Sequence, residues 1–221
     1  MPLSTVLGAQ SLVQPAVCTT ATRPASPYTG QAIYDTTTAS QLIWNGTAWT
    51  GTGGLVYLTG TTFSAASTVS LPASTFNANY DNYRLIFSIT AASTNATALN
   101  ARLRISATDN SASNYYNSGI GSITSANTVV YARADFATAF LFGYLISTDA
   151  NSLTLDVMQP FSSTVATKVA YSHFGRDVGN NVAGHTGGGG HNTTTSFDAF
   201  TIYPAAGTIT GSYKVYGYAN S

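Results

Sequence analysis

From residue 55 to the end of the chain, apolar and polar side chains alternate in short segments. The clearest are residues 85–90, 99–106 and 153–158, in which every second side chain is apolar. A repeat of two residues is typical of a β-strand that buries one face. Further candidate strands are residues 56–58, 69–71, 120–123, 129–134, 139–146, 165–174, 197–203 and 212–218.

Clusters of turn-forming residues separate these segments, for example at 109–111, 149–151 and 179–181. We expect roughly eight to ten strands and no helix, because Thr, Val, Ile, Tyr and Phe abound while helix-favouring residues are scarce. This pattern predicts an all-β fold, an antiparallel two-sheet sandwich with jelly-roll connectivity. The sequence contains no internal repeat of about 20–50 residues that would indicate a propeller or a solenoid.

The N-terminal quarter differs in composition from the rest, with a change at the glycine-rich residues 51–54. Residues 1–22 are rich in Ser, Thr, Ala and Gln, which predicts an extended arm. Residues 23–51 contain two short candidate strands and Asn45-Gly46, a strong signal for a hairpin turn. Because a unit this small needs large aromatic side chains inside, we predict a small β module with Tyr34, Trp44 and Trp49 at its core. The sandwich domain is then expected over residues 55–221.

Charged residues are scarce, which limits the kinds of molecule that the chain is expected to bind. They make up 7% of the chain, against about 25% in a typical soluble domain, and there is no Glu. Thr, Ser and Asn together number 73 of 221 residues. The formal net charge is zero and no basic cluster is present, which argues against nucleic acid as a partner. Near-zero charge favours association, so we expect the chain to be part of a larger assembly.

The sequence predicts neither a disulfide framework nor a membrane segment. A single cysteine, Cys18, cannot form an intramolecular disulfide. Residues 1–15 have no basic start and no long apolar core, so they do not resemble a signal peptide. The longest apolar stretch, residues 136–146, is about half the length of a membrane span, which argues against membrane insertion.

The most site-like segment is residues 176–192, in which two of the three histidines flank four glycines. Three interpretations stay open: a solvated hairpin loop without a ligand, a loop at a sandwich end that contacts a receptor or another subunit, and a metal site shared by three chains. We expect no metal and no other cofactor, with His185 and His191 as the nearest metal candidates. His173 is expected to be a core or interface histidine. The candidate contact residues are His185, Gly187, Gly188, Gly189, Gly190, His191 and Asn192.

The sequence shows no pattern of catalytic residues, so we expect a non-enzymatic protein. The glycine run is followed by His191-Asn192 and not by the Lys-Ser/Thr pair of a phosphate-binding loop. A glycosidase needs two carboxylates beside the scissile bond; Asp149 and Asp156 have the closest spacing, which a turn cap and a surface strand residue explain. The adjacent Tyr115-Tyr116 could stack on sugars or fill an edge of the sandwich.

Three segments resemble bacteriophage virion surface proteins. The first is similar to a short N-terminal module of phage tail fibres. Its pattern is Arg23-Pro24, then Gly-Gln-Ala-Ile-Tyr-Asp-Thr at residues 30–36, then Trp-Asn-Gly-Thr-Ala-Trp at residues 44–49. Residues 79–91 and 207–221 are similar to strands of the same broad group. The resemblance implies a non-enzymatic, β-rich and usually homotrimeric protein on the virion surface.

Three functions stay open within that resemblance. The leading one is a short tail fibre or tail-tip subunit that attaches to a host surface glycan or protein, while the N-terminal arm binds other virion proteins. The second is a decoration protein that stabilises the exterior of the capsid. The third is a tailspike-type protein that binds or cleaves carbohydrate, which the missing pair of carboxylates disfavours.

Overall fold

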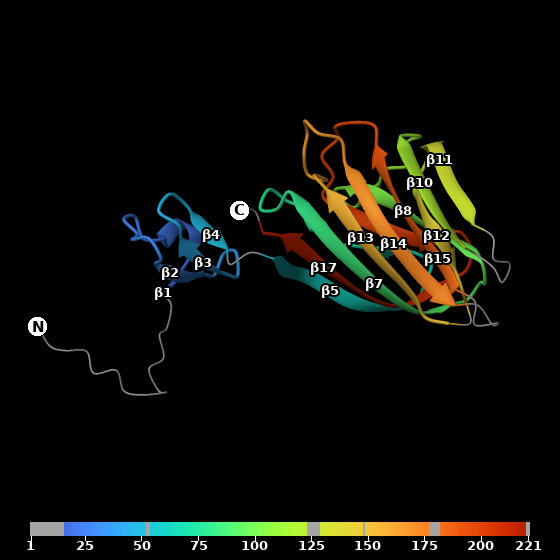
Figure 1. Ribbon diagram of the computed structural model, residues 1–221, viewed down its shortest axis with the longest axis horizontal. Coiled ribbons are helices and arrows are strands. Elements are labelled where there is room, and N and C mark those ends of the chain that lie inside the picture. Colours follow the sequence, from blue (N-terminus) through green and yellow to red (C-terminus); the bar gives the residue numbers. More distant parts are fainter. Residues whose placement is uncertain (1–15, 52–53, 123–128, 148, 177–181, 220–221) are drawn as a thin grey trace, which may run out of the picture. The chain divides into compact units, whose positions relative to one another are not determined.

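The computed structural model describes residues 16–51, 54–122, 129–147, 149–176 and 182–219, and strands dominate it (Figure 1). The chain divides into two compact units, Met1–Gly54 with Ala219–Ser221, and Leu55–Tyr218. This division lies within the glycine-rich residues at which the composition changes. Among the described residues, the structure contains no helix that could serve as a membrane span.

The smaller unit consists of β1 (Ala16–Cys18), a 3-10 helix (Thr20–Thr22), β2 (Ala32–Asp35), β3 (Ser40–Trp44) and β4 (Trp49–Gly51), with the strands in this order in one sheet. β3 and β4 form the antiparallel hairpin predicted at Asn45-Gly46. The arm predicted over residues 1–22 is wrong at its C-terminal end, because β1 pairs in parallel with β2 and is part of the sheet. Residues 1–15 of that arm lie outside the described residues.

The centre of the smaller unit is aliphatic. Ile33 and Leu42 are paired across β2 and β3, and both are buried. The core predicted at Tyr34 is wrong: Tyr34 is 39% exposed, because alternation along β2 turns its side chain away from the buried face. Trp44 and Trp49 are half-buried and pack edge to face with ring centroids 5.5 Å apart, so they cover the base of the hairpin.

Asp35 is a fully buried acid in this unit. Its carboxylate accepts hydrogen bonds from Arg23 Nε at 2.7 Å, from Thr20 Oγ1 at 2.9 Å and from the backbone of Thr37 at 2.8 Å. Burial raises the pKa of Asp35, but these hydrogen bonds outweigh burial and lower the pKa below its usual value. One ion pair therefore joins two parts of the pattern that resembles virion proteins, Arg23 and residues 30–36.

The described part of the larger unit contains thirteen strands, more than the eight to ten expected, because short pairings and a glycine-rich strand also join the sheets. One sheet comprises β5 (Leu55–Ala66), β7 (Asn82–Ala92), β10 (Tyr115–Ser122), β11 (Val130–Ala137), β13 (Asn151–Met158), β14 (Lys168–Arg176), β15 (Val182–His191) and β17 (Ile209–Tyr218). The other comprises β6 (Val69–Ser70), β8 (Thr97–Ile105), β9 (Thr108–Asp109), β12 (Phe140–Leu145) and β16 (Ala199–Pro204).

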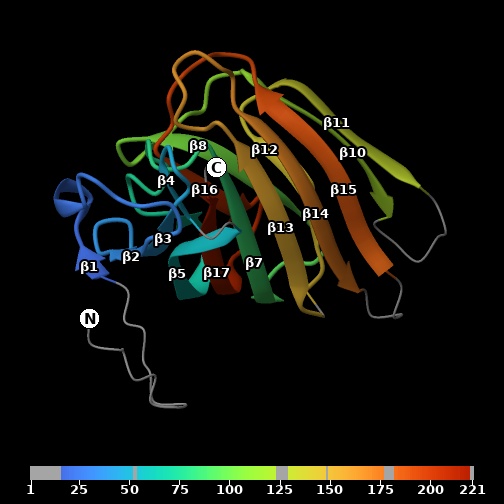
Figure 2. The same ribbon diagram turned by 60° about the vertical axis from the view of Figure 1, so that its left-hand side comes forward.

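This unit is an antiparallel β-sandwich, and the predicted all-β fold class is confirmed. The large sheet has the strand order β11-β10-β15-β14-β13-β7-β17-β5, which Figure 2 shows across its width. In the small sheet, β12, β8, β16 and β6 are neighbours, and β9 pairs with β8. The final strand, β17, lies between β5 and β7. This order does not confirm the jelly-roll connectivity, which stays a prediction.

The two sheets share one hydrophobic core. Ring contacts cross between them: Tyr115 of β10 packs on Phe140 of β12, and Tyr171 of β14 packs on Phe142 of β12, each with centroids 4.8 Å apart. The buried Asn117 of β10 also bridges the sheets through hydrogen bonds with the backbone N–H and C=O of β12, both at 3.2 Å. The inner faces of β10 and β14 are therefore fixed to the opposite sheet, which leaves their outer faces for solvent or a partner.

Candidate ligand-binding groove

The glycine-rich segment predicted as a loop is a strand, and its expected place at an end of the sandwich is also wrong. β15 lies inside the large sheet, between β14 and β10. From Gly184 to Gly190, every residue is paired on both sides. These pairings provide the hydrogen-bond partners that a buried backbone requires. The loop prediction failed because glycine is depleted in strands and a glycine run carries no side-chain alternation.

The residues of β15 alternate between the two faces of the sheet. Gly187 is paired with Tyr171, which is buried, so this position faces the core. Gly190 is paired with Lys168, which is exposed, so that position faces outward. The inner set is His185, Gly187, Gly189 and His191, and the outer set is Thr186, Gly188 and Gly190.

Close packing requires glycine at the inner positions. A β-carbon at Gly187 would overlap the carbonyl oxygen of Ser118 and would lie 2.9 Å from the Tyr171 hydroxyl. A β-carbon at Gly189 would lie 2.9 Å from Cβ of Asn117. Both distances are shorter than ordinary van der Waals contact. The packing of the sandwich therefore explains the inner glycines without any ligand.

His173 and His185 are paired across β14 and β15, and both are buried, so the prediction of a core position for His173 is confirmed. None of their four ring nitrogens has a hydrogen-bond partner among the described residues. Burial, with a smaller contribution from the neighbouring His185, lowers the pKa of His173 to about 4. Burial also lowers the pKa of His185. Both rings are therefore uncharged near neutral pH.

The two histidines considered for a metal do not meet. His191 follows His185 by six residues along the strand, a separation of about 20 Å. His191 is 1% exposed and lies between the rings of Tyr115 and Phe197, both with centroids at 4.9 Å. Its Nδ1 is 2.9 Å from the hydroxyl oxygen of Thr193, and burial lowers its pKa. The described part of the chain has no group of three or more His, Cys, Asp or Glu that could hold a metal.

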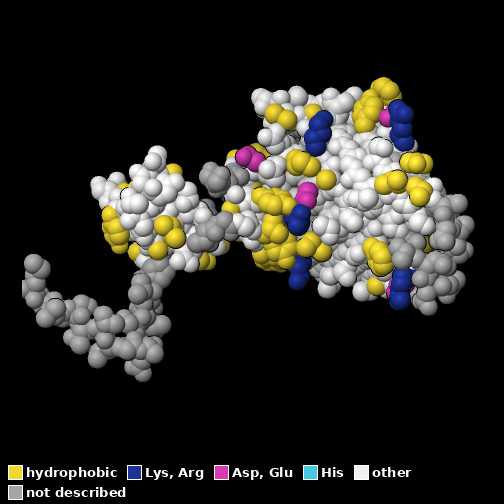
Figure 3. Space-filling model, viewed as in Figure 1, with side chains coloured by type: hydrophobic (Ala, Val, Ile, Leu, Met, Phe, Trp, Pro, Cys, Tyr) yellow, Lys and Arg dark blue, Asp and Glu magenta, His cyan; other side chains and the backbone are white. Residues whose placement is uncertain are grey.

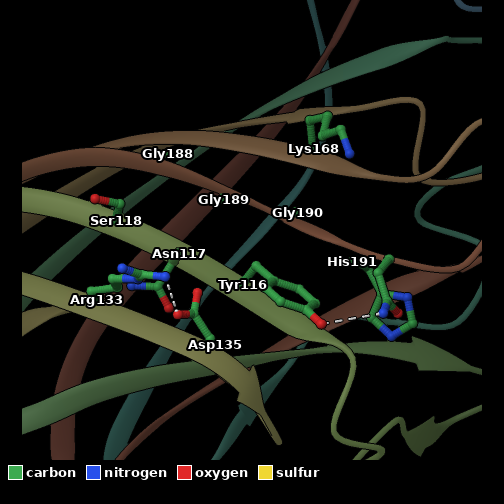
Figure 4. Close-up of a pocket in the computed structure, with 11 residues that line it drawn as sticks. Tyr116, Asn117, Ser118, Arg133, Asp135, Lys168, Gly188, Gly189, Gly190 and His191 are labelled. Carbon is green, nitrogen blue, oxygen red and sulfur yellow. Dashed lines mark hydrogen bonds and ion pairs between the residues drawn. The ribbon is translucent and has the colours of Figure 1, made fainter.

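A groove of about 700 Å³ lies on the outer face of the large sheet, where β11, β10, β15 and β14 are neighbours (Figure 4). This volume is in the range of small-ligand sites, roughly 300–1,000 Å³. Of the predicted contact residues, Gly188 to Asn192 line the groove, whereas His185 and Gly187 do not. The complete lining is Tyr116, Asn117, Ser118, Arg133, Asp135, Lys168, Gly188, Gly189, Gly190, His191 and Asn192.

The outer glycines form the floor, and contrasting side chains stand on either side of it (Figure 4). On the β10 side, the Tyr116 ring packs edge to face on Phe136 with centroids 5.0 Å apart. The Tyr116 hydroxyl accepts a hydrogen bond from Nδ2 of Asn192 at 3.5 Å. On the β14 side, Lys168 forms no ion pair with any described residue. The groove thus combines an aromatic ring, an amide and a free ammonium group.

The sequence did not predict most of the side chains that line the groove. Arg133 and Asp135, on β11, form an ion pair at 2.5 Å that removes one positive charge from the groove. They line the same groove as Lys168 only because β11, β10, β15 and β14 follow one another in the sheet, and no spacing in the sequence connects them. Tyr116 was predicted as a possible sugar-stacking residue, because it is one of two adjacent tyrosines. The structure separates their roles, because Tyr115 is buried in the core and Tyr116 lines the groove.

The two carboxylates closest in sequence are each held by an arginine. Asp149 lies 2.9 Å from Nε of Arg176, and this hydrogen bond lowers the pKa of Asp149. Asp156 accepts hydrogen bonds from Nε and Nη2 of Arg84 at 2.8 and 2.7 Å, which lower its pKa against the effect of burial. Both are therefore ionised at neutral pH and neutralised by a neighbour, an arrangement unlike that of a general acid.

The outer face of the large sheet around β7, β13 and β14 carries few charged side chains (Figure 3), and Arg84 and Asp156 there form an ion pair. Hydroxyl side chains share the outward positions there with apolar ones: Ser152, Thr154 and Ser172 lie on the same face as Ile86 and Phe174, which are 38% and 46% exposed. Such a face suits binding through hydrogen bonds, ring stacking and isolated charge contacts rather than through a strong electrostatic field.

Comparison of the chain with models of protein families, with curated proteins and with solved structures finds no match.

Proposed function

We propose that this chain is a non-enzymatic structural protein of a bacteriophage virion, a short tail-fibre or tail-tip subunit that mediates attachment to the host. The groove on the large sheet carries the proposal. It combines Tyr116, Asn192 and Lys168 around a backbone floor on an exposed face, and these groups suit binding rather than bond cleavage. The acids most closely spaced in sequence are occupied by arginines.

The division into two units supports this function. The segments that resemble the N-terminal module of tail fibres fall in the smaller unit, where Arg23 and Asp35 hold them together. The groove lies in the larger unit. We assign attachment to the particle to the smaller unit and the residues before it, and contact with the host surface glycan or protein to the larger unit.

Assembly as a homotrimer is part of the proposal. β11 is an edge strand of the large sheet, and it exposes 81% of Tyr131 beside Ile120, which is 45% exposed. An unpaired edge with exposed apolar side chains favours contact with another chain. Light scattering of the full chain should give a mass near three times 22.9 kDa. A monomer that stays folded at micromolar concentration would contradict the trimer.

Two measurements test the function. Antibodies against the full chain should label the tail of particles of the phage that encodes it, as seen by electron microscopy. The purified chain should also compete with the phage for adsorption to host cells in a concentration-dependent way. Label on the capsid without competition would replace the proposal with capsid decoration, and absence of label from the particle would overturn it.

A further inference from the structure

The bare floor of the groove is not required by the fold. A β-carbon at Gly188 would have a single neighbour within 4 Å, the carbonyl oxygen of Val169 at 3.1 Å. A β-carbon at Gly190 would lie 2.9 Å from Cδ and 3.2 Å from Nζ of Lys168, a side chain that can rotate away, and 3.1 Å from the carbonyl oxygen of Thr167. These contacts contrast with the backbone overlap at the inner glycines. Something other than packing is needed to explain two adjacent outward positions without side chains.

Absence of side chains lets a flat ligand approach the backbone of β15. Glycine serves this purpose where another molecule must come close to the main chain. The Tyr116 ring stands on one side of the floor, backed by Phe136, so it offers a fixed apolar surface. A sugar ring presents a C–H face to such an aromatic surface, and its hydroxyls can exchange hydrogen bonds with Ser118 and Asn192.

The charge of the groove points to one anionic group on the ligand. Lys168 bends over the floor, because its ammonium nitrogen lies 3.2 Å from the β-carbon position of Gly190. Arg133 is already neutralised by Asp135. His191 is buried and adds no positive charge. Among the described residues that line the groove, Lys168 is therefore the one cation without an ion pair, which matches a single carboxylate better than a polyanion such as nucleic acid.

We propose that this groove binds an acidic saccharide, a pyranose that carries one carboxylate. The ring lies on the floor at Gly188 against Tyr116, and the carboxylate accepts hydrogen bonds from the ammonium of Lys168, which covers Gly190. This inference rests on the proposed function, since it names the chemistry that the attachment protein would recognise. Hexuronic acids and nonulosonic acids both present this chemistry.

The experiment compares acidic saccharides with uncharged counterparts on the full chain. Trigalacturonate is set against its methyl ester, and sialyllactose against lactose, by isothermal titration calorimetry and by saturation-transfer NMR. We expect at least one acid to bind about tenfold or more tightly than its counterpart. A dependence on salt should accompany this preference, because one charge contact is partly screened.

The chain offers matched controls for both parts of the groove. Lys168→Met should remove the preference for the acid. The chain has one other lysine, Lys214 on β17, and Lys214→Met should retain the preference. Gly188→Val should weaken the binding of acid and counterpart alike by about tenfold or more, because it fills the floor. Ser172→Val, at an exposed position of β14 outside the lining, should leave both affinities unchanged. Circular dichroism establishes that each variant is folded.

The outcomes separate this inference from the proposed function. Equal affinity for acid and counterpart, failure to bind either acid, or an acid preference that persists in Lys168→Met would overturn the acidic-saccharide site. If the chain still blocks phage adsorption in that case, the attachment function stands without it. If the acid binds as expected but neither the chain nor the acid blocks adsorption, the site stands and the attachment function fails.

Discussion

The two faces of β15 place one run of glycines in opposite physical situations. On the inner face, Gly187 lies under the Tyr171 hydroxyl and beside two uncharged, buried histidines. On the outer face, Gly188 and Gly190 lie beside a free lysine and open to a groove. A β-carbon at an inner position would overlap the backbone of β10, whereas one at an outer position would lie 3.1 Å from a carbonyl oxygen, which needs to move by only a few tenths of an ångström.

Glycine therefore has two separate roles in this strand: on the inner face it avoids a clash, and on the outer face it leaves room for a ligand. Only the packed structure distinguishes them. Inner glycines leave room for the backbone of β10 and for the Tyr171 hydroxyl. On the outer face, Gly188 is partly exposed, whereas Gly190 is buried under the Lys168 side chain. Substitutions on the inner face should therefore affect mainly stability, and substitutions on the outer face mainly binding.

The largest effect is expected for Gly187→Val. The new β-carbon would overlap the Ser118 carbonyl oxygen, and the larger side chain would also meet the Tyr171 hydroxyl. Backbone of β10 cannot yield without losing its pairing with β15, so we expect the free energy of unfolding to fall by at least about 3 kcal/mol. Urea denaturation followed by tyrosine fluorescence and circular dichroism measures this, because both tryptophans lie in the smaller unit. A variant as stable as the original chain would show that the inner face is loosely packed.

A slightly smaller loss is expected for Asn117→Leu. The side-chain amide of this buried residue donates to the carbonyl oxygen of Leu141 and accepts from its N–H, both at 3.2 Å. Leucine keeps the volume but leaves these backbone groups of the opposite sheet without that partner. We expect a loss of about 2–3 kcal/mol in the free energy of unfolding. Asn192→Leu, at an exposed position of the groove, is the control and should change stability by less than about 0.5 kcal/mol.

Acid should destabilise the inner face through its histidines. Because the pKa of His173 falls to about 4 in the folded chain, the unfolded chain binds more protons between pH 6.5 and 4, and stability decreases as the pH falls through this window. His173 alone should account for a loss of about 2 kcal/mol between pH 8 and pH 5. Denaturation at both pH values measures it, and His173→Leu should shrink the difference. A stability that is constant from pH 8 to 5 would contradict a neutral buried pair.

The sequence predicted the sandwich well where one face of a strand is apolar and the other polar. Residues 99–106 and 153–158 alternate clearly, and β8 and β13 form there. The same signal failed in β15, whose inner face consists of glycine and histidine. A weak signal was present, because His185 and His191 are an even number of residues apart and so share one face of a strand.

The sequence predicted only part of the groove lining. The glycine run was found because it is unusual in composition, and residues 188–192 do line the groove. Lys168, Arg133 and Ser118 were not found, because the strand order β11-β10-β15-β14 brings them together and only the folded sheet contains that information. The error at Tyr34 has a local cause: bulk alone was used to assign a core, and alternation along β2 overrides bulk.

The smallest effect on stability is expected for Gly188→Ala. Its φ is not in the left-handed region, and the one neighbour of the new methyl group is the Val169 carbonyl oxygen at 3.1 Å, which must move by only a few tenths of an ångström. Alanine also restricts the unfolded chain more than glycine does, which offsets that cost. We expect the free energy of unfolding to change by less than about 1 kcal/mol, measured beside Gly187→Ala on the same strand. A loss comparable with that of Gly187→Ala would mean that the outer glycines, too, are required by the fold, and the distinction between the two faces of β15 would no longer hold.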